Sequence, residues 1–351
     1  MARPLGIAAL LLIASVPAAN AATCTPTGFI RDGMDMTAAE INPPGTVSGD
    51  VDATGCNIAI YYGPGSSGRV QFANVHGANY FGIVNNGGNA SIQNSSISNI
   101  GETPFNGTQH GVGIYFAFNS NSKGDIQGNY IWSYQKGGIV VNGPLASSNI
   151  TGNTVIGLGP VNFIAQNGIQ VGYGAHANVQ QNLVYGNAYT GTSDASGGIL
   201  VVGGDYYGGP PTTNVQVVGN NGLANDVGIW FSNLDASGNS VTTPTRDSAV
   251  NNTLANNAVT NPVYQAGISD QGDGDSFVNN TICGSGYAAN PIDTAGSNNP
   301  SVKNNNTACA GPGGHANAAI AGLKRHRVPG LRSHLHMATA AAAGIAVRPY
   351  Q

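Results

Sequence analysis

A Gly-Ile pair recurs along the chain, in most steps at intervals of 25 to 31 residues. The pairs are Gly82-Ile83, Gly113-Ile114, Gly138-Ile139, Gly168-Ile169, Gly198-Ile199, Gly228-Ile229 and Gly267-Ile268. Between successive pairs lies a second element, in which an aliphatic residue shortly precedes an Asn, as in Ile150-Thr151-Gly152-Asn153. Repetition at such a period is the signature of a solenoid, in which every unit adopts the same structure.

Each repeat offers short strands that are separated by turn-prone Gly and Asn. A strand of three to five residues cannot bury its apolar side alone, but equivalent strands stacked about 4.8 Å apart form one continuous core. Asn tolerates left-handed turn conformations, so an Asn that recurs at one corner of the coil is expected to form a stacked, structural ladder. The expected ladder consists of Asn94, Asn129, Asn153, Asn182, Asn220, Asn252, Asn280 and Asn305.

This pattern resembles the parallel β-helix repeat of the pectate-lyase-like superfamily over about residues 50 to 310. The resemblance, with the general preference for right-handed crossovers, implies an all-β, right-handed parallel β-helix of about 8 to 10 coils. An antiparallel β-sandwich or propeller is the alternative, and it requires hairpin dipeptides at shorter intervals. The superfamily includes lyases, hydrolases, epimerases, esterases, phage tailspikes and adhesins, so the resemblance leaves the function open.

The composition agrees with a β-solenoid. Only 8% of residues are charged and 52 of 351 are Gly, which excludes a conventional helical enzyme. We expect a signal peptide at residues 1 to 22, an N-terminal cap at 23 to 57, the β-helix at 58 to 310 and a basic, disordered tail at 311 to 351. Without the tail, the body is acidic, with a net charge of about -10.

Export favours disulfide bonds between the four cysteines. Three pairings are possible, and we favour Cys24 with Cys56 and Cys283 with Cys309, because these local loops pin the two ends of an elongated body. The spacing does not indicate a metal site, since there is neither a Cys-x-x-Cys motif nor a nearby His pair.

Two adjacent coils lengthen the same turn. From the Ile of a pair to the next Asn the interval is 11 to 15 residues in most coils, but 21 from Ile199 to Asn220 and 23 from Ile229 to Asn252. Such loops build a wall beside the Gly-Ile sheet and predict a groove for a long polymer. They contain Asp205, Tyr206, Tyr207, Arg246 and Asp247.

Strand alternation places Tyr115 and Trp230 on the outward side of the sheet. An exposed aromatic ring at a groove can cover the apolar face of a sugar. The alternative is that these rings only shield the loops. We name Trp230, Tyr115, Tyr206 and Tyr207 as candidate substrate-binding residues.

The charged residues admit two reactions on a polysaccharide. Glycoside hydrolysis needs two carboxyl groups about 5 to 9.5 Å apart, for which Asp205, Asp226 and Asp247 are candidates. A lyase needs a base and a positive group that stabilises the anion formed, for which Arg246, Lys136 and His110 are candidates. The chain lacks the adjacent aspartates, the Gly-His-Gly and the Arg-x-Lys of polygalacturonases with this fold, so no catalytic residue carries over from the resemblance by motif.

The stretch Ser269-Asp270-Gln271-Gly272-Asp273-Gly274-Asp275 has oxygen ligands at a calcium-like spacing. Asp270, Asp273 and Asp275 are therefore candidate Ca²⁺ ligands, with a plain acidic turn as the alternative. No cofactor is expected to be required.

Two functions remain open at this point. One is an exported, polysaccharide-binding β-helix that acts as a polysaccharide lyase, glycoside hydrolase or epimerase; the other is a non-catalytic surface or adhesion protein. For both we expect a polysaccharide or glycan surface as partner, no nucleic acid, and no transmembrane segment after signal cleavage. The expected location is secreted, periplasmic or at the cell surface.

Overall fold

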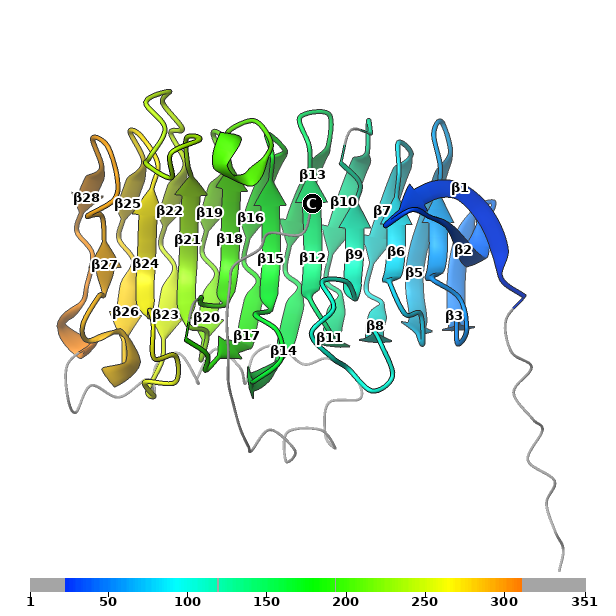
Figure 1. Cartoon of the computed structure of the whole chain (residues 1–351), viewed down its shortest axis with the longest axis horizontal. Helices are drawn as coiled ribbons and strands as arrows, with labels where there is room; N and C mark the ends of the chain where they lie inside the picture. The colour runs from blue at the N-terminus through cyan, green and yellow to red at the C-terminus, as the bar shows by residue number, and fades with distance from the viewer. Residues whose placement is uncertain (1–22, 119, 193, 311–351) are drawn as a thin grey trace, which may run out of the picture.

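The chain folds into a single stack of short strands (Figure 1). The computed structural model describes residues 23 to 118, 120 to 192 and 194 to 310. The expected signal peptide and basic tail lie outside these residues. All the described regular structure is strand apart from three short 3-10 helices, η1 (Asp205–Tyr207), η2 (Ser285–Tyr287) and η3 (Ala308–Ala310).

One side of the stack is an eleven-stranded sheet, called here the first sheet. Its strands are β1 (Thr25–Arg31), β2 (Met34–Ile41), β4 (Ile58–Tyr62), β6 (Phe81–Asn85), β9 (Val112–Phe116), β12 (Gly137–Asn142), β15 (Asn167–Gly172), β18 (Gly197–Gly203), β21 (Val227–Asn233), β24 (Ala266–Gln271) and β27 (Ile292–Asp293). Only β1 runs antiparallel to its neighbour, and every other pair is parallel.

The other two sides form a second sheet of seventeen strands with two parallel ladders. The second ladder consists of β3 (Thr46–Asp52), β5 (Ser67–His76), β7 (Asn89–Gln93), β10 (Lys123–Gln127), β13 (Ser147–Thr151), β16 (His176–Gln180), β19 (Gln216–Val218), β22 (Ser248–Val250), β25 (Ser276–Val278) and β28 (Ser301–Lys303). The third ladder starts from the end of β5 and continues through β8 (Ser96–Ile100), β11 (Tyr130–Tyr134), β14 (Thr154–Val161), β17 (Leu183–Tyr189), β20 (Asn221–Leu223), β23 (Thr253–Ala255) and β26 (Thr281–Cys283).

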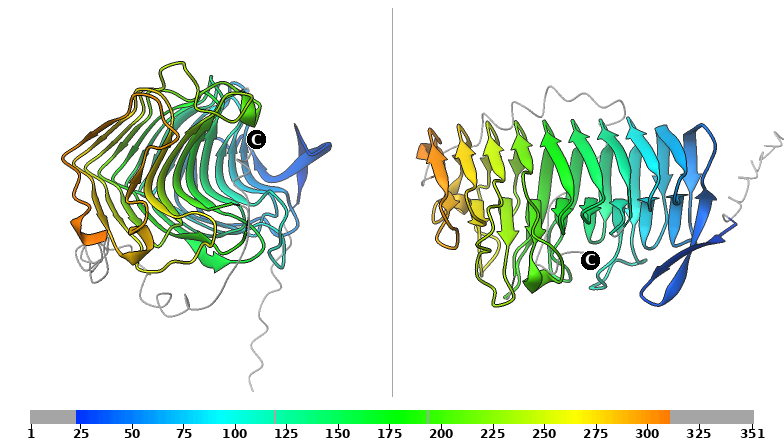
Figure 2. Two further views of the ribbon diagram at one scale, coloured as in Figure 1. Left: turned by 60° about the vertical axis from the view of Figure 1, so that its left-hand side comes forward. Right: turned by 90° about the horizontal axis from the view of Figure 1, so that it is seen from above.

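The Gly-Ile segments stack in register, which confirms a parallel β-helix and excludes the antiparallel alternative. Nine Ile residues pair one above the next along the first sheet and form a buried inner column. They are Ile60, Ile83, Ile114, Ile139, Ile169, Ile199, Ile229, Ile268 and Ile292. Figure 2 shows the coils end-on and from above. The right-handed twist of the coil stays a prediction of the resemblance.

Gly precedes each Ile because no side chain fits there. A Cβ at Gly168 would lie 2.6 Å from the carbonyl oxygen of Gly198 and 2.3 Å from Cγ1 of Val184. The same close approach to the carbonyl of the next coil, at 2.4 to 2.7 Å, recurs at Gly82, Gly113, Gly138, Gly198, Gly228 and Gly267. Coils that stack at strand spacing thus require Gly at this corner.

Six side chains form the expected Asn ladder between the second and third ladders. In each step an amide Nδ2 donates to the Oδ1 of the next Asn at 2.9 to 3.0 Å. The ladder runs through Asn129, Asn153, Asn182, Asn220, Asn252, Asn280 and Asn305. Asn94 is not part of it: Ser95 occupies that corner, and its backbone N donates to Asn129 Oδ1 at 3.1 Å.

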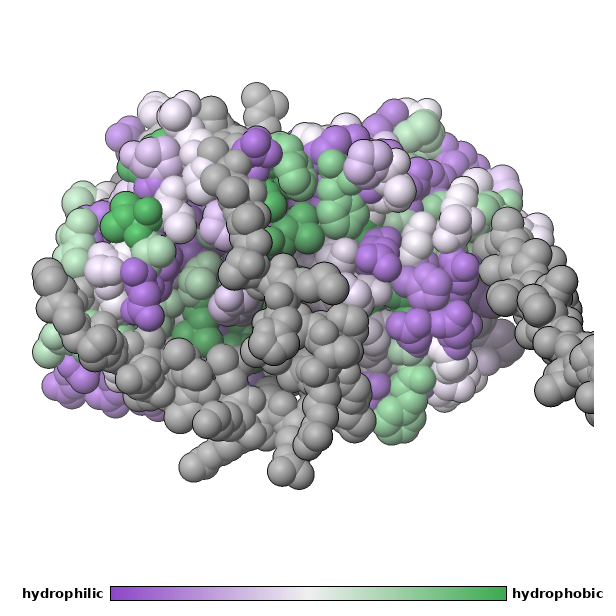
Figure 3. Space-filling model, turned by 90° about the horizontal axis from the view of Figure 1, so that it is seen from below, coloured by the Kyte–Doolittle hydropathy of each residue, from purple (hydrophilic) through white to green (hydrophobic). Residues whose placement is uncertain are grey.

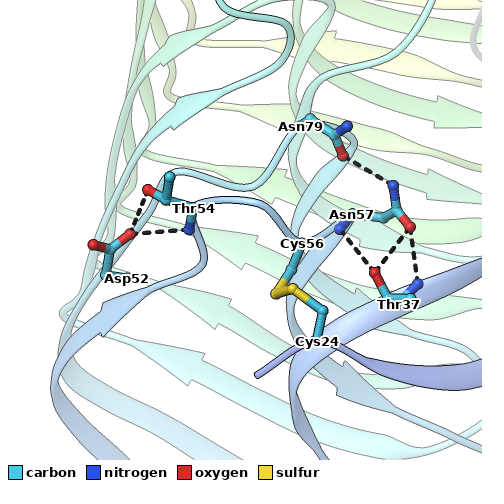
Figure 4. Close-up of a disulfide and its surroundings, with 7 residues drawn as sticks. All are labelled: Cys24, Thr37, Asp52, Thr54, Cys56, Asn57 and Asn79. Carbon is cyan, nitrogen blue, oxygen red and sulfur yellow. Dashed lines mark hydrogen bonds between the residues drawn. A yellow bond between two sulfur atoms is a disulfide. The ribbon is translucent and has the colours of Figure 1, made fainter. Parts of the chain in front are cut away.

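Both predicted disulfides are present, Cys24–Cys56 and Cys283–Cys309. Figure 4 shows the first of them, which ties the start of β1 to the turn before β4. Beside it, Asn57 accepts from the backbone N of Thr37 at 2.9 Å and donates to Asn79 at 3.1 Å. β2 and β3 already pair in parallel with coil strands, so the β-helix begins inside the range predicted as a cap.

Candidate functional site

The sequence-predicted catalytic residues divide between the two edges of the first sheet. Its strands begin at the amino edge and end at the carboxyl edge. Asp205, Tyr206, Tyr207, Arg246 and Asp247 lie at the carboxyl edge, and His110, Lys136 and Asp226 lie at the amino edge. Asp226 precedes β21 and Asp247 follows it. Seven residues of strand span roughly 20 Å, far more than the 5 to 9.5 Å that glycoside hydrolysis needs. The expected carboxylate pair is therefore not assembled.

The two enlarged loops do lie side by side, as the intervals predicted. The backbone N of Tyr206 donates to Leu234 O at 3.4 Å, and Tyr207 Oη lies 2.8 Å from Ser232 Oγ. Asp205 and Tyr206 are exposed. Arg246 is exposed while its neighbour Asp247 is buried, so these two side chains leave the backbone in different environments.

Asp247 belongs to a buried carboxyl cluster with Asp270 and Asp275. Asp275 Oδ1 accepts from the backbone N of Asp247 at 2.7 Å and from Thr245 Oγ1 at 2.6 Å. The Oδ2 atoms of Asp270 and Asp275 are buried without a hydrogen-bond partner. A proton on one of them supplies the missing donor. Burial, followed by the charge of Asp275, raises the pKa of Asp270 to about 8, and the same causes raise the pKa of Asp247.

This cluster predicts that the fold is more stable in mild acid. The pKa of Asp270 rises from its usual value of 3.8 to about 8 on folding, so the folded state retains a proton that the unfolded chain releases. The free energy of unfolding should therefore fall as the pH rises from about 4 to about 8, by up to about 1.4 kcal/mol per pH unit for each such group. Asp270→Asn, a neutral isostere, should flatten this slope in urea titrations. An unchanged slope in the variant would contradict the assignment.

Asp226 anchors a turn at the amino edge. Its Oδ2 accepts from the backbone N of Tyr189 at 2.8 Å and of Ser196 at 3.0 Å, and Thr260 Oγ1 lies 3.2 Å from Oδ1. The side chain is fully buried, and burial raises the pKa of Asp226 to about 7. These contacts give Asp226 a structural role in fixing the loops before β18 and β24.

Lys136 and His110 are neighbours in sequence-adjacent coils, but their side chains do not meet. The backbone N of Lys136 donates to Gly111 O at 2.9 Å, which brings the two turns together. Lys136 Nζ then donates to Ala165 O at 2.9 Å, and burial lowers the pKa of Lys136 to about 7. His110 instead stacks on Tyr80 at 3.8 Å and places Nε2 2.7 Å from Glu102 Oε1. Neither side chain reaches Arg246, since they lie at opposite edges of the sheet.

The three expected calcium ligands do not converge. Asp273 Oδ1 accepts from Asn299 Nδ2 at 2.8 Å, away from the Asp270 and Asp275 pair. Within residues 23 to 118, 120 to 192 and 194 to 310, no three His, Cys, Asp or Glu side chains are placed to hold a metal ion.

A pocket lies on the outward side of the first sheet, over β21, β24 and β27. We call it the outer pocket. Its volume is about 260 Å³, and it is lined by Asp194, Ala195, Trp230, Val263, Tyr264, Ser269, Asp270, Gln271, Asp293 and Gly296. The register Trp230, Ser269, Asp293 places these three side chains in one outward row on consecutive coils.

Two aromatic rings form one wall of the outer pocket. The centroids of Trp230 and Tyr264 are 5.9 Å apart, with the planes at 43°. Trp230 Nε1 donates to Gln271 Oε1 at 3.2 Å, while the Tyr264 hydroxyl donates to Asp293 Oδ2 at 2.6 Å and is also hydrogen-bonded to Ser269 at 2.9 Å. Burial, followed by the bond to Asp293, raises the pKa of Tyr264, so its hydroxyl stays protonated.

Trp230 is the one candidate aromatic residue that lines this pocket. Tyr115 does point outward, as expected, but it is only 1% exposed and stacks on Phe81 at 5.1 Å. Tyr206 and Tyr207 form an edge-to-face pair in the loop at the carboxyl edge.

Sequence reasoning missed Tyr264 and Asp293. Tyr264 lies in a loop at the amino edge, where the lengths were not compared. The interval from Asn252 to Gly267 is 15 residues, against 8 from Asn220 to Gly228 in the preceding coil. This difference was the available signal for an enlarged loop beside Trp230.

A second hollow, of about 280 Å³, lies on the outer side of β10, β13 and β16. There Asn149 donates to Asp125 at 2.9 Å and Asn178 donates to Asn149 at 3.1 Å. Its described lining is polar and includes His176 but no aromatic ring of the Trp, Tyr or Phe type. The amino-edge turns are the surface seen in Figure 3, where hydrophilic residues gather toward the N-terminal end.

Comparisons with known proteins add little. Neither a scan of protein-family models nor a search of curated proteins finds a match. Among solved structures, the chain is similar to the tailspike protein gp49 from Pseudomonas phage LKA1, with 15% identity and a TM-score of 0.36 over 77% of this chain and 48% of the tailspike. The chain thus spans about half the length of that protein, and so distant a similarity carries no information on function. The assignment to the pectate-lyase-like superfamily stays a prediction.

Two properties bear on location. The disulfides are consistent with an extracytoplasmic protein. Among the described residues, no helix has the length and apolar character needed to cross a membrane.

Proposed function

We propose that this protein binds a polysaccharide at the outer pocket and presents a surface for attachment rather than a catalytic centre. The observation that carries the proposal is the Trp230 and Tyr264 pair on the outward face of the sheet. Aromatic rings with one polar edge cover the apolar face of a sugar while their hydrogen-bonding groups stay available. The pocket is open on the side of a repeating sheet, which suits a chain-like ligand.

The placement of the acids supports binding over cleavage. Asp226 and Asp247 flank opposite ends of β21 and are both buried. Asp270 lines the pocket and has a raised pKa, but it pairs in register with Phe231, a member of the inner core, so its carboxyl group points inward. A general acid must reach the leaving oxygen of the substrate, and Asp270 does not meet this condition.

The expected location of this activity is outside the cytoplasm, as a secreted, periplasmic or cell-surface protein. A rod of stacked coils that holds a glycan on one flank suits an adhesive role. The alternative of a lyase, hydrolase or epimerase would need acids that the ligand can reach in the outer pocket.

Substitutions of the aromatic residues test the proposal. Trp230→Ala and Tyr264→Ala should each weaken binding to an oligosaccharide panel by about tenfold or more, because each loses aromatic contact with the sugar. Tyr206→Ala is the matched control, since Tyr206 is 59% exposed in the loop at the carboxyl edge. Isothermal titration calorimetry on the full chain gives the affinities. Loss of binding in Tyr206→Ala alone would move the site to the carboxyl edge, and no binding by the wild type would refute the proposal.

A further inference from the structure

The outer pocket contains a carboxylate without a cationic partner. Asp293 is half-buried, accepts from the Tyr264 hydroxyl at 2.6 Å and accepts from the backbone N of Ala295 at 3.0 Å. The ion pairs found between described residues all involve His76 or His110, so none of them neutralises Asp293. A half-buried carboxylate bonded only by neutral donors has capacity left for a charged donor.

The remaining lining has the same electrostatic sign. Asp194 is a second carboxylate at the opposite end of the pocket, and no described lining residue is Lys, Arg or His. The faces of Trp230 and Tyr264 add negative potential, because aromatic rings attract cations over their faces. A ligand that brings a carboxylate into this pocket therefore meets repulsion, and one that brings an ammonium group meets attraction.

The charge of the whole body acts in the same direction. Residues 23 to 310 contain six Lys and Arg against sixteen Asp and Glu. Such a field steers cationic polymers toward the protein and slows the approach of polyanions.

From these observations we infer that the polysaccharide carries free primary amino groups, as a deacetylated amino-sugar polymer does, and that Asp293 binds one ammonium group in the outer pocket. The inference rests on the proposed function and names its ligand class. The sugar ring lies against Trp230, and the ammonium group donates to Asp293, whose position is fixed by the Tyr264 hydroxyl. Polyuronates are disfavoured ligands for this pocket.

Three matched oligomers test the inference on the full-length protein. A glucosamine hexamer at about pH 6 should bind about tenfold more tightly than its N-acetylated counterpart, and a galacturonate hexamer should not bind measurably. Asp293→Asn should remove the tenfold preference and leave the affinity for the acetylated hexamer unchanged. Tyr264→Phe keeps the ring but frees Asp293, so it should reduce the preference only in part.

A control separates the site from the overall charge. Asp125→Asn changes the net charge by the same amount at the second hollow, on another side of the stack, and should leave the preference intact. Equal binding of the free and acetylated hexamers, tight binding of the galacturonate hexamer, or an equal effect of Asp125→Asn would overturn the inference while leaving polysaccharide binding in place. Failure of all three hexamers and of a neutral glycan panel to bind would refute the proposed function itself.

Discussion

Asn182→Ala should destabilise the fold by about 3 to 6 kcal/mol. The Asn182 amide accepts from the backbone N and from Nδ2 of Asn153, and it donates to Ile150 O and to Asn220 Oδ1, all at 2.9 to 3.0 Å. The substitution leaves the buried backbone N of Asn153 without an acceptor and interrupts the ladder at its centre. Buried polar groups that lose their partner cost about 1 to 3 kcal/mol each. Urea-induced unfolding, followed by far-UV circular dichroism, gives the value.

Asn178→Ala is the matched control for this prediction. Asn178 lies four residues earlier, in β16, where its exposed amide donates only to Asn149 on the outer surface. Water replaces such a bond, so the change should stay within about 0.5 kcal/mol. Similar effects of the two substitutions would show that the inner amide ladder does not hold the coils together.

Gly138→Ala should cost about 3 kcal/mol or more, and it tests the stacking of the Gly-Ile corner. A Cβ at Gly138 would lie 2.6 Å from Gly168 O and 2.3 Å from Cγ1 of Val155. The carbonyl belongs to the next coil, so the two coils must separate or tilt to make room. Overpacking of a dense core typically costs about 1 to 3 kcal/mol, and a backbone contact cannot be relieved by a rotamer change.

The neighbouring Gly137→Ala provides the comparison. Both residues belong to β12 and both are buried, but the nearest atom to a Cβ at Gly137 is a side-chain methyl, Cγ2 of Val140, at 3.1 Å. We expect a change within about 1 kcal/mol there. If Gly137→Ala and Gly138→Ala have the same thermal midpoint, the Gly of the repeat is not required by stacking.

The sequence predicted the fold because stacking imposes the same requirement on every coil. Ile must fill the interior at each level, and Gly must precede it where the carbonyl of the next coil approaches, so both recur visibly. Asn recurs because its amide both donates and accepts along the stack. The one misplaced member, Asn94, stands beside Ser95, which takes the corner, and no pattern in a single sequence separates adjacent polar residues of this kind.

The site was predicted only in part because it does not repeat. Trp230 was found from strand alternation, which the register confirms. Rarity of charge drew attention to Asp226 and Asp247, but their contacts are with backbone amides that only the folded chain brings near. Tyr264 and Asp293 come from different coils and meet through a hydroxyl bond, and sequence spacing does not encode such a meeting.

Tryptophan fluorescence tests the central claim, that a glycan lies against Trp230 in the outer pocket. The chain has two Trp residues, and the other, Trp132, lies in β11 on the third ladder. In Trp132→Phe, emission therefore reports on Trp230 alone. We expect the glucosamine hexamer to change this emission in a saturable manner, with the same midpoint as the heat of binding. Heat of binding without any change in emission would contradict the claim, because it would place the glycan elsewhere on the protein.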